Sequence, residues 1–271
     1  MRTLLTRSIS GLIFVALVVL SLILEPYYFL VFSAIIVGIG SSEFHRLFFT
    51  KETKGSAESI YMITSLCIYL LLSAPYYFEN LTYNSVNYIL LATFVFYLIL
   101  QLFLYQVNIK KLLILLGGMA YVIIPFVLAS EIHSFNQGEF PLLFAVFSLV
   151  WTNDTFAYIT GNLIGKHKLY EKISPNKTWE GFAGGVAFTI AAGYLLDLYT
   201  APTQNEHLWM IAALVIAPAA VAGDLIESAL KRKMNVKDTG KIMPGHGGIL
   251  DRFDAMLLAL PVFYIFLYLC S

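Results

Sequence analysis

Long apolar segments alternate with short polar ones along almost the whole chain. A membrane-spanning helix needs about 20 mostly apolar residues, because the hydrocarbon core is about 30 Å thick and a helix rises about 1.5 Å per residue. Nine segments approach this length, so the pattern predicts an all-α polytopic membrane protein with about nine transmembrane helices. The predicted spans lie near residues 8–24, 26–42, 59–75, 86–106, 112–130, 140–160, 181–198, 207–230 and 253–270.

The basic residues are confined to alternate polar segments. If the N-terminus is cytoplasmic, the cytoplasmic segments are 1–7, 43–58, 107–111, 161–180 and 231–252, and these hold all 17 lysines and arginines. Lys and Arg concentrate in cytoplasmic loops of membrane proteins. This distribution predicts a cytoplasmic N-terminus and a C-terminus on the outer side.

The composition agrees with a membrane protein. Hydrophobic residues make up 59% of the chain, charged residues 13%, and the mean hydropathy is +0.76. The net charge is zero, which leaves no overall field to attract nucleic acid. Cys67 and Cys270 lack ligand-like spacing, so we expect neither a zinc site nor a disulfide and interpret both as core residues. The first apolar segment lacks a small-x-small cleavage pattern, and we expect a retained anchor.

Polarity is distributed unevenly between the two halves. The first five spans are almost free of ionisable residues, whereas carboxylates, lysines and glycines stand at helix ends from Trp151 onward. We therefore predict an N-terminal transmembrane scaffold over residues 1–130 and a C-terminal catalytic region over residues 131–271. The expected site faces the cytoplasm.

The eighth predicted span ends in a cluster of polar residues. If this helix continues to about residue 232, Asp224, Glu227, Ser228 and Lys231 lie on one face. Carboxylates near the hydrocarbon are costly unless they are paired, bind metal or line a watery cavity. The polar face therefore indicates a site at the membrane boundary.

Further carboxylates begin the ninth predicted span. Asp251 and Asp254 are spaced i and i+3, so they can face the same cavity as Asp224. Carboxylate oxygens are the ligands that Mg²⁺ prefers beside substrate phosphates. The nearby cations can contact phosphate oxygens; they are Lys231, Arg232, Lys237 and Arg252.

Glycines follow the eighth span in the run Pro244-Gly-His-Gly-Gly248. Glycine allows backbone N–H groups to approach an anion closely, so Gly247 and Gly248 are candidate phosphate contacts. His246 could be a general base, a phosphate donor or a turn residue. The alternative for the whole run is a solvated loop with ion pairs at helix ends.

Two upstream segments add candidates. Asp154 lies inside the sixth span, where an ionisable residue indicates function, the alternative being a buried helix–helix hydrogen bond. Lys177 and Thr178 stand just before the seventh helix, where a helix N-terminus can bind an anion. Gly181 and Gly185 form a small-xxx-small face that favours close helix packing.

The C-terminal half resembles a known family. The ordered run from Ser228 through Lys237-Asp238 and Pro244–Gly248 to Asp251-Arg-Phe-Asp254 is similar to the signature of phosphatidate cytidylyltransferases, also called CDP-diacylglycerol synthases. The segments 154–158 and 174–181 resemble further blocks of that family. The motif-level resemblance covers Trp151 to Asp254. One departure is Asn176, where family members often carry lysine.

The resemblance implies that phosphatidate and CTP react to give CDP-diacylglycerol and pyrophosphate, with Mg²⁺ required. The number of carboxylates also suggests a second cation, such as K⁺. The resemblance is consistent with metal binding by Asp224, Asp251 and Asp254, supported by Asp154, Glu227 and Asp238. Phosphate groups would be held by basic and hydroxyl side chains, namely Lys177, Thr178, Ser228, Lys231, Arg232, Lys237 and Arg252. The expected location is the cell membrane, with membrane lipids as partners and a homodimer through the apolar first half.

The three alternatives are two other membrane phosphotransferases and, from a different class, a transporter. A CTP-dependent lipid kinase or a phosphosugar transferase onto a lipid carrier would use similar residues. An ion-coupled transporter would use Asp154 and Asp224 as ion ligands, but the chain lacks the paired halves common in such folds. The sequence leaves open the choice between CTP and dCTP, the acyl-chain selectivity and the residues that contact cytosine.

Overall fold

The structure is a computed structural model of the 271-residue chain. It describes residues 2–49, 55–78, 80–81, 86–87, 89–93, 95–97, 99, 109–135, 141–200, 207–243, 245 and 247–270. These residues form two compact units, the first made of residues 1–135 with 238–252 and the second of residues 136–237 with 253–271.

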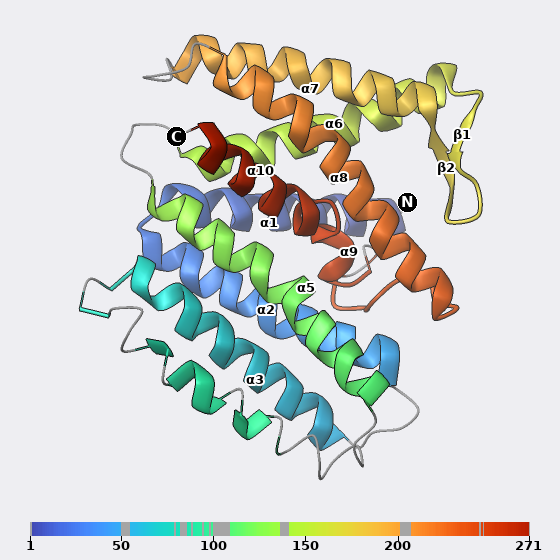
Figure 1. Ribbon diagram of the computed structural model, residues 1–271. Helices are drawn as coiled ribbons and strands as arrows, with labels where there is room; N and C mark the ends of the chain where they lie inside the picture. The colour runs from blue at the N-terminus through green and yellow to red at the C-terminus, as the bar shows by residue number, and fades with distance from the viewer. Residues whose placement is uncertain are drawn as a thin grey trace. The chain divides into compact units, whose positions relative to one another are not determined.

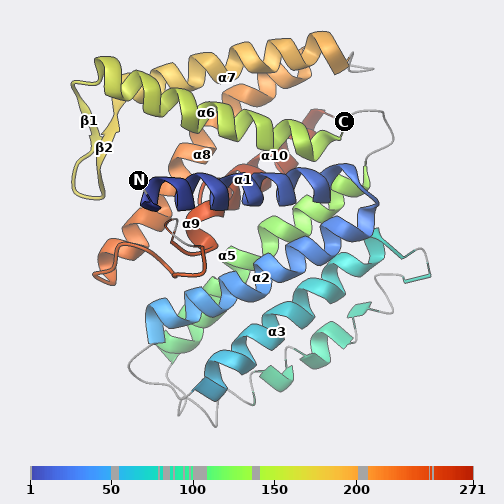
Figure 2. The ribbon, with the colours of Figure 1, turned by 180° about the vertical axis from the view of Figure 1, so that it is seen from behind.

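The first unit is built from apolar helices. It contains α1 (Arg2–Ile23), α2 (Pro26–Phe49), α3 (Gly55–Ser73), the short 3-10 helix η1 (Ala74–Tyr76) and α5 (Ile109–Ser134). Helices α2, α3 and α5 pack against one another, as Figure 2 shows. Gly118 lets α5 approach α2 closely, because a Cβ there would overlap the ring of Phe44.

Polar groups between these helices are paired with one another. The Tyr61 hydroxyl donates to the carbonyl oxygen of Leu115 at 2.9 Å. The Tyr69 hydroxyl contacts the hydroxyls of Ser33 at 2.5 Å and Ser130 at 3.0 Å. Buried hydroxyls must find partners inside an apolar bundle, so these contacts fix how α2, α3 and α5 pack.

The second unit is also mainly helical. It contains α6 (Leu142–Ile164), the strands β1 (Lys168–Tyr170) and β2 (Ser174–Thr178), α7 (Trp179–Thr200), α8 (Leu208–Lys233) and α10 (Met256–Cys270). Helix α7 packs on both α6 and α8, as Figure 1 shows. The short helix α9 (Leu250–Phe253) runs across the sequence boundary between the units.

Glycines allow α6 and α7 to approach closely. A Cβ at Gly181 would lie 2.7 Å from the carbonyl oxygen of Ala157, and one at Gly185 would lie 2.8 Å from Oδ1 of Asn153. The predicted packing role of the small-residue face is therefore confirmed.

The membrane interpretation holds for the part of the chain that the structure describes. Six of its helices are long and apolar enough to cross a membrane, spanning residues 26–49, 56–76, 109–134, 142–164, 179–200 and 208–233. Two shorter apolar helices cover residues 8–23 and 256–270. Almost half of the predicted fourth span, 86–106, lies outside the described residues, so the number of nine spans and their orientation stay predictions.

Three sequence-based expectations were wrong. Residues 168–178 form an antiparallel hairpin, in which Lys168 pairs with Thr178 and Tyr170 with Ser174, rather than a plain loop. The last apolar segment does not begin as one helix at residue 253, since α9 ends at Phe253 and α10 starts at Met256. Cys67 and Cys270 are free and exposed rather than part of the core.

Candidate active site

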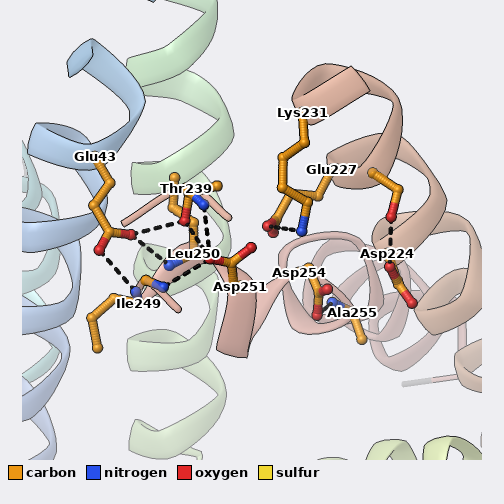
Figure 3. Close-up of polar contacts among 12 residues, drawn as sticks. Glu43, Asp224, Glu227, Lys231, Thr239, Ile249, Leu250, Asp251, Asp254 and Ala255 are labelled. Carbon is orange, nitrogen blue, oxygen red and sulfur yellow. Dashed lines mark hydrogen bonds and ion pairs between the residues drawn. The ribbon is translucent and has the colours of Figure 1, made fainter. Parts of the chain in front are cut away.

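The C-terminal end of α8 carries the predicted polar face. Helix α8 continues to Lys233, as the sequence indicated. The Ser228 hydroxyl donates to Asp224 at 3.1 Å, and the Lys231 ammonium donates to Glu227 at 3.0 Å. Both bonds join residues four positions apart, which are neighbours on the surface of a helix. Figure 3 shows Glu227 and Lys231 pointing toward each other, with Asp224 on the same helix.

The hairpin contributes a cation to this face. Nζ of Lys177, at the end of β2, lies 2.5 Å from Oδ2 of Asp224. The two side chains are 25% and 31% exposed, so a ligand can still reach them. Arg232 also contacts the hairpin, donating from Nε to the carbonyl oxygen of Ile173 at 3.4 Å. The hairpin that the sequence did not predict therefore holds one of the predicted phosphate-binding residues.

A carboxylate from the break between α9 and α10 joins this group. Asp254 accepts a hydrogen bond from the N–H of Ala255 at 2.8 Å. Its backbone approaches α8 closely, because a Cβ at Gly223 would lie 2.6 Å from the carbonyl oxygen of Asp254. Burial, together with the negative charges of Asp224 and Asp154, raises the pKa of the Asp254 carboxyl above its ordinary value of 3.8.

We call these residues the α8 cluster: Lys177, Asp224, Glu227, Ser228, Lys231 and Asp254. The cluster combines two interacting aspartates with two ammonium groups that are themselves paired to carboxylates. Such a mixture of charges suits a phosphate group that approaches together with a cation.

The base of the hairpin is fixed to the start of α7. Glu180 accepts hydrogen bonds from the N–H groups of Lys166 at 3.1 Å and His167 at 3.2 Å, and His167 Nδ1 lies 2.6 Å from its Oε1. The Thr178 hydroxyl oxygen accepts from the N–H of Gly181 at 3.1 Å, which satisfies a donor in the first turn of α7. Thr178 is thus a buried capping residue in the structure.

A second polar group lies in the first unit, where α2 meets residues 238–252. Figure 3 shows the Glu43 side chain pointing toward the backbone of this segment. Its carboxylate accepts hydrogen bonds from the N–H groups of Ile249 and Leu250, each at 3.0 Å. Glu43 is only 4% exposed, so both of its oxygens face protein.

Asp251 holds the same segment from the other side. Its Oδ2 accepts from the N–H of Thr239 at 2.8 Å, from the Thr239 hydroxyl at 2.9 Å and from the N–H of Gly248 at 2.8 Å. The Thr239 hydroxyl also lies 3.2 Å from Oε2 of Glu43. We call these residues the Glu43 cluster: Glu43, Thr239, Gly248, Ile249, Leu250 and Asp251.

The remaining predicted residues are placed as follows. Asp154 is exposed on α6 and accepts a 3.4 Å hydrogen bond from the buried Asn153. Gly247 has a φ of +83°, as expected for a glycine turn. His246 lies outside the described residues, and three polar residues are exposed, namely Lys237, Asp238 and Arg252.

The predicted metal ligands do not all converge. Among the described residues, no three histidine, cysteine, aspartate or glutamate side chains form a group that could hold a metal ion. Asp224 and Asp254 interact within the α8 cluster, whereas Asp251 binds backbone in the Glu43 cluster. The metal and substrate roles of all these residues stay predictions.

Sequence reasoning missed Glu43. The prediction ended the second span at residue 42 and treated Glu43 as part of a loop, but α2 continues to Phe49. The local signal was the short polar run Ser41-Ser-Glu43, which stands between Ile39-Gly40 and Phe44. Its partners are about 200 positions away in sequence, at separations of 196 to 207 residues, and no local pattern could have identified them.

Comparison with curated proteins gives several relatives that bear the name phosphatidate cytidylyltransferase. A phosphatidate cytidylyltransferase of Staphylococcus epidermidis is 45% identical over 152 residues, which are 56% of this chain and 57% of the relative. A protein of the same name from Bacillus subtilis is 43% identical over 52% of this chain and 52% of the relative. Another from Staphylococcus aureus is 42% identical over 56% of this chain and 57% of the relative. The chain spans just over half the length of the curated relatives it matches.

The family comparison covers far more of the sequence. A sequence model described as "Cytidylyltransferase family" matches residues 5–270 of the 271. Both polar clusters, and all but the terminal residues 1–4 and 271 of the two units, fall within this match. The chain therefore belongs to the cytidylyltransferase family.

Proposed function

We propose that the protein is an integral membrane phosphatidate cytidylyltransferase, which makes CDP-diacylglycerol and pyrophosphate from phosphatidate and CTP. One observation carries the proposal: the α8 cluster places the Lys177 ammonium against Asp224 at the end of an apolar helix. The relatives that share the family bear the name of this activity. We further propose the cell membrane as its location, with the site facing the cytoplasm.

The α8 cluster fits a divalent cation. Together with burial, the negative charge of Asp224 contributes to raising the pKa of the Asp254 carboxyl. A cation between carboxylates relieves such repulsion, and oxygen ligands are those that Mg²⁺ prefers. We propose that Asp224 and Asp254 hold Mg²⁺, with Asp154 nearby. Asp251 and Glu227 are further candidate metal ligands, and a second cation such as K⁺ is a further candidate for binding. When bound, Mg²⁺ supplies positive charge to the phosphate oxygens.

The reaction needs positioning more than proton transfer. A phosphate oxygen of phosphatidate is already ionised at neutral pH, so it can attack the α-phosphorus of CTP without a general base. One P–O bond forms, the bond from the α-phosphorus to the bridging oxygen breaks, and the electron pair leaves with pyrophosphate. Lys177 and Lys231 would hold phosphate oxygens in line for this attack.

The carboxylates position the lysines for this role. Glu227 is 2% exposed at its side chain and keeps the Lys231 ammonium in a fixed place, itself only 12% exposed. Asp224 does the same for Lys177. The low exposure of the Glu227–Lys231 pair limits its contact with water, which strengthens the effect of the Lys231 charge on a bound phosphate. The acyl chains of phosphatidate would stay in the lipid bilayer, beside the apolar surfaces of α6, α7 and α8.

The test is product formation by the purified full-length protein in detergent. Phosphatidate, CTP and Mg²⁺ should give CDP-diacylglycerol and pyrophosphate in equal amounts, and omission of lipid or addition of EDTA should abolish both. Phosphorylated lipid as the product would favour a lipid kinase. Transfer of a phosphosugar from an added nucleotide sugar to an added lipid carrier would favour a phosphosugar transferase. Ion uptake into vesicles without either product would favour a transporter.

A further inference from the structure

The loop between α8 and α9 has little regular structure of its own. Apart from one bridge between Met243 and Gly247, the described residues from 239 to 249 form neither helix nor strand. Backbone N–H groups in such a loop must find acceptors elsewhere. Three of them, together with the N–H of Leu250 at the start of α9, donate to just two carboxylates, those of Glu43 and Asp251.

The glycines of the loop are needed by this arrangement. A Cβ at Gly240 or at Gly248 would overlap the Glu43 carboxylate, and one at Gly247 would lie 2.7 Å from Oδ2 of Asp251. The loop therefore closes around both carboxylates at positions where a side chain does not fit. The glycine-rich sequence, interpreted above as a phosphate contact, also serves to bind these two side chains.

One hydroxyl connects the two carboxylates. The Thr239 oxygen lies 2.9 Å from Oδ2 of Asp251 and 3.2 Å from Oε2 of Glu43. Thr239 is 9% exposed and Asp251 8%, so water contributes little to holding them. The orientation of the Asp251 side chain thus depends on where Glu43 holds the loop.

We propose that Glu43 is a positioning residue for cytidylyl transfer, which sets the 239–250 loop and, through Thr239, the Asp251 carboxylate. This inference rests on the function proposed above and extends it to a residue of α2. The role requires a carboxylate, because the Ile249 N–H donates to Oε1 while the Leu250 N–H and Thr239 contact Oε2. A glutamine has one acceptor oxygen, so its NH₂ group would face at least one of these donors.

The experiment compares the full-length wild type with three variants in detergent. E43Q tests the carboxylate. T239V removes the hydroxyl that joins Glu43 to Asp251 at nearly constant volume. E58Q is the matched control, because Glu58 pairs with Arg46 and Ser42 and makes no bond to the loop among the contacts described.

Two measurements are needed, amide hydrogen exchange and steady-state kinetics. In E43Q we expect exchange at Thr239, Gly248, Ile249 and Leu250 to rise by about tenfold or more, because these amides lose their acceptors or neighbours. We expect kcat to fall by about tenfold to a hundredfold while the KM for CTP changes by less than about threefold, since positioning and not substrate binding is lost. T239V should shift both quantities in the same direction, and E58Q should leave both near the wild type.

The outcomes separate this inference from the proposed function. Wild-type protein that makes no CDP-diacylglycerol would overturn the proposed function and the catalytic part of the inference with it. The exchange data would then still decide whether Glu43 holds the loop. If the wild type is active, normal loop exchange or normal kcat in both E43Q and T239V would overturn the inference alone.

Discussion

The start of α8 is held by a residue of the preceding helix. His207, directly before α8, makes no side-chain capping bond. Instead Asp197 of α7 accepts the N–H of Trp209 at 2.8 Å and that of Met210 at 3.0 Å. A Cβ at Gly193, one turn earlier in α7, would overlap the backbone of Trp209, so glycine allows this approach.

Replacing Asp197 by alanine should destabilise the protein without impairing its chemistry. The carboxylate is 7% exposed and Trp209 1%, so water cannot fully replace the lost acceptor. A hydrogen bond to a charged acceptor contributes about 1.5–3 kcal/mol and a helix cap about 0.5–2 kcal/mol, which gives about 2–4 kcal/mol for the two bonds together. At about 2–4 °C per kcal/mol, Tm should fall by roughly 5–15 °C.

The assay pairs thermal unfolding in detergent with turnover measured well below Tm. Asp224 lies about 22 Å along α8 from Trp209 at about 1.5 Å per residue, so kcat should stay within about twofold of the wild type. D197N keeps one acceptor oxygen and should lose about half as much stability. An unchanged Tm in D197A would refute the capping argument, and a large loss of kcat in folded protein would refute the separation of stability from catalysis.

Three further predictions concern the two clusters. K177M removes the ammonium beside Asp224, and we expect turnover to fall by about tenfold to a hundredfold. The Tm should change little, because a partly exposed ion pair contributes little stability. Normal turnover would argue against the role of Lys177. G248A should lower both Tm and turnover. The control is G117A, because a Cβ at Gly117 would meet nothing within 4 Å, and it should raise stability by about 0.5–1 kcal/mol. Equal effects of the two substitutions would contradict the steric argument. Burial and the charge of Asp224 raise the pKa of the Asp254 carboxyl above its ordinary value of 3.8. Without metal, the folded protein therefore keeps a proton on Asp254 at pH values where the unfolded chain has released it. The free energy of unfolding should fall as pH rises from about that ordinary pKa toward neutrality. D254N should lack this loss in unfolding experiments with EDTA, and a pH dependence identical to that of the wild type would contradict it.

Most of the helices could be predicted from the sequence, because a long apolar run is a local signal. The end of α8 and the position of Lys177 before α7 follow from the same signal. The hairpin could not be predicted in this way, since Ser174–Thr178 is a short polar strand with a proline and no alternating pattern. The break before Met256 was missed because the apolar composition continues across it.

The candidate site was predictable only in part. Spacing along α8 correctly placed Ser228 beside Asp224 and Lys231 beside Glu227. Spacing also suggested that Asp251 and Asp254 act alike, but one binds loop backbone and the other joins the α8 cluster. Such differences arise from contacts between distant segments, and a single sequence carries no direct record of them.

The separation between Glu43 and its partners has a consequence for biosynthesis. Thr239, Ile249 and Leu250 follow Glu43 by 196, 206 and 207 residues. The ribosome has therefore released α2 and most of the later helices before any of these donors exists. A nascent chain that stops short of residue 238 leaves the Glu43 carboxylate without the donors that bury it. Completion of the first unit thus has to wait until residues 238–252 have been made, long after the rest of that unit has left the ribosome.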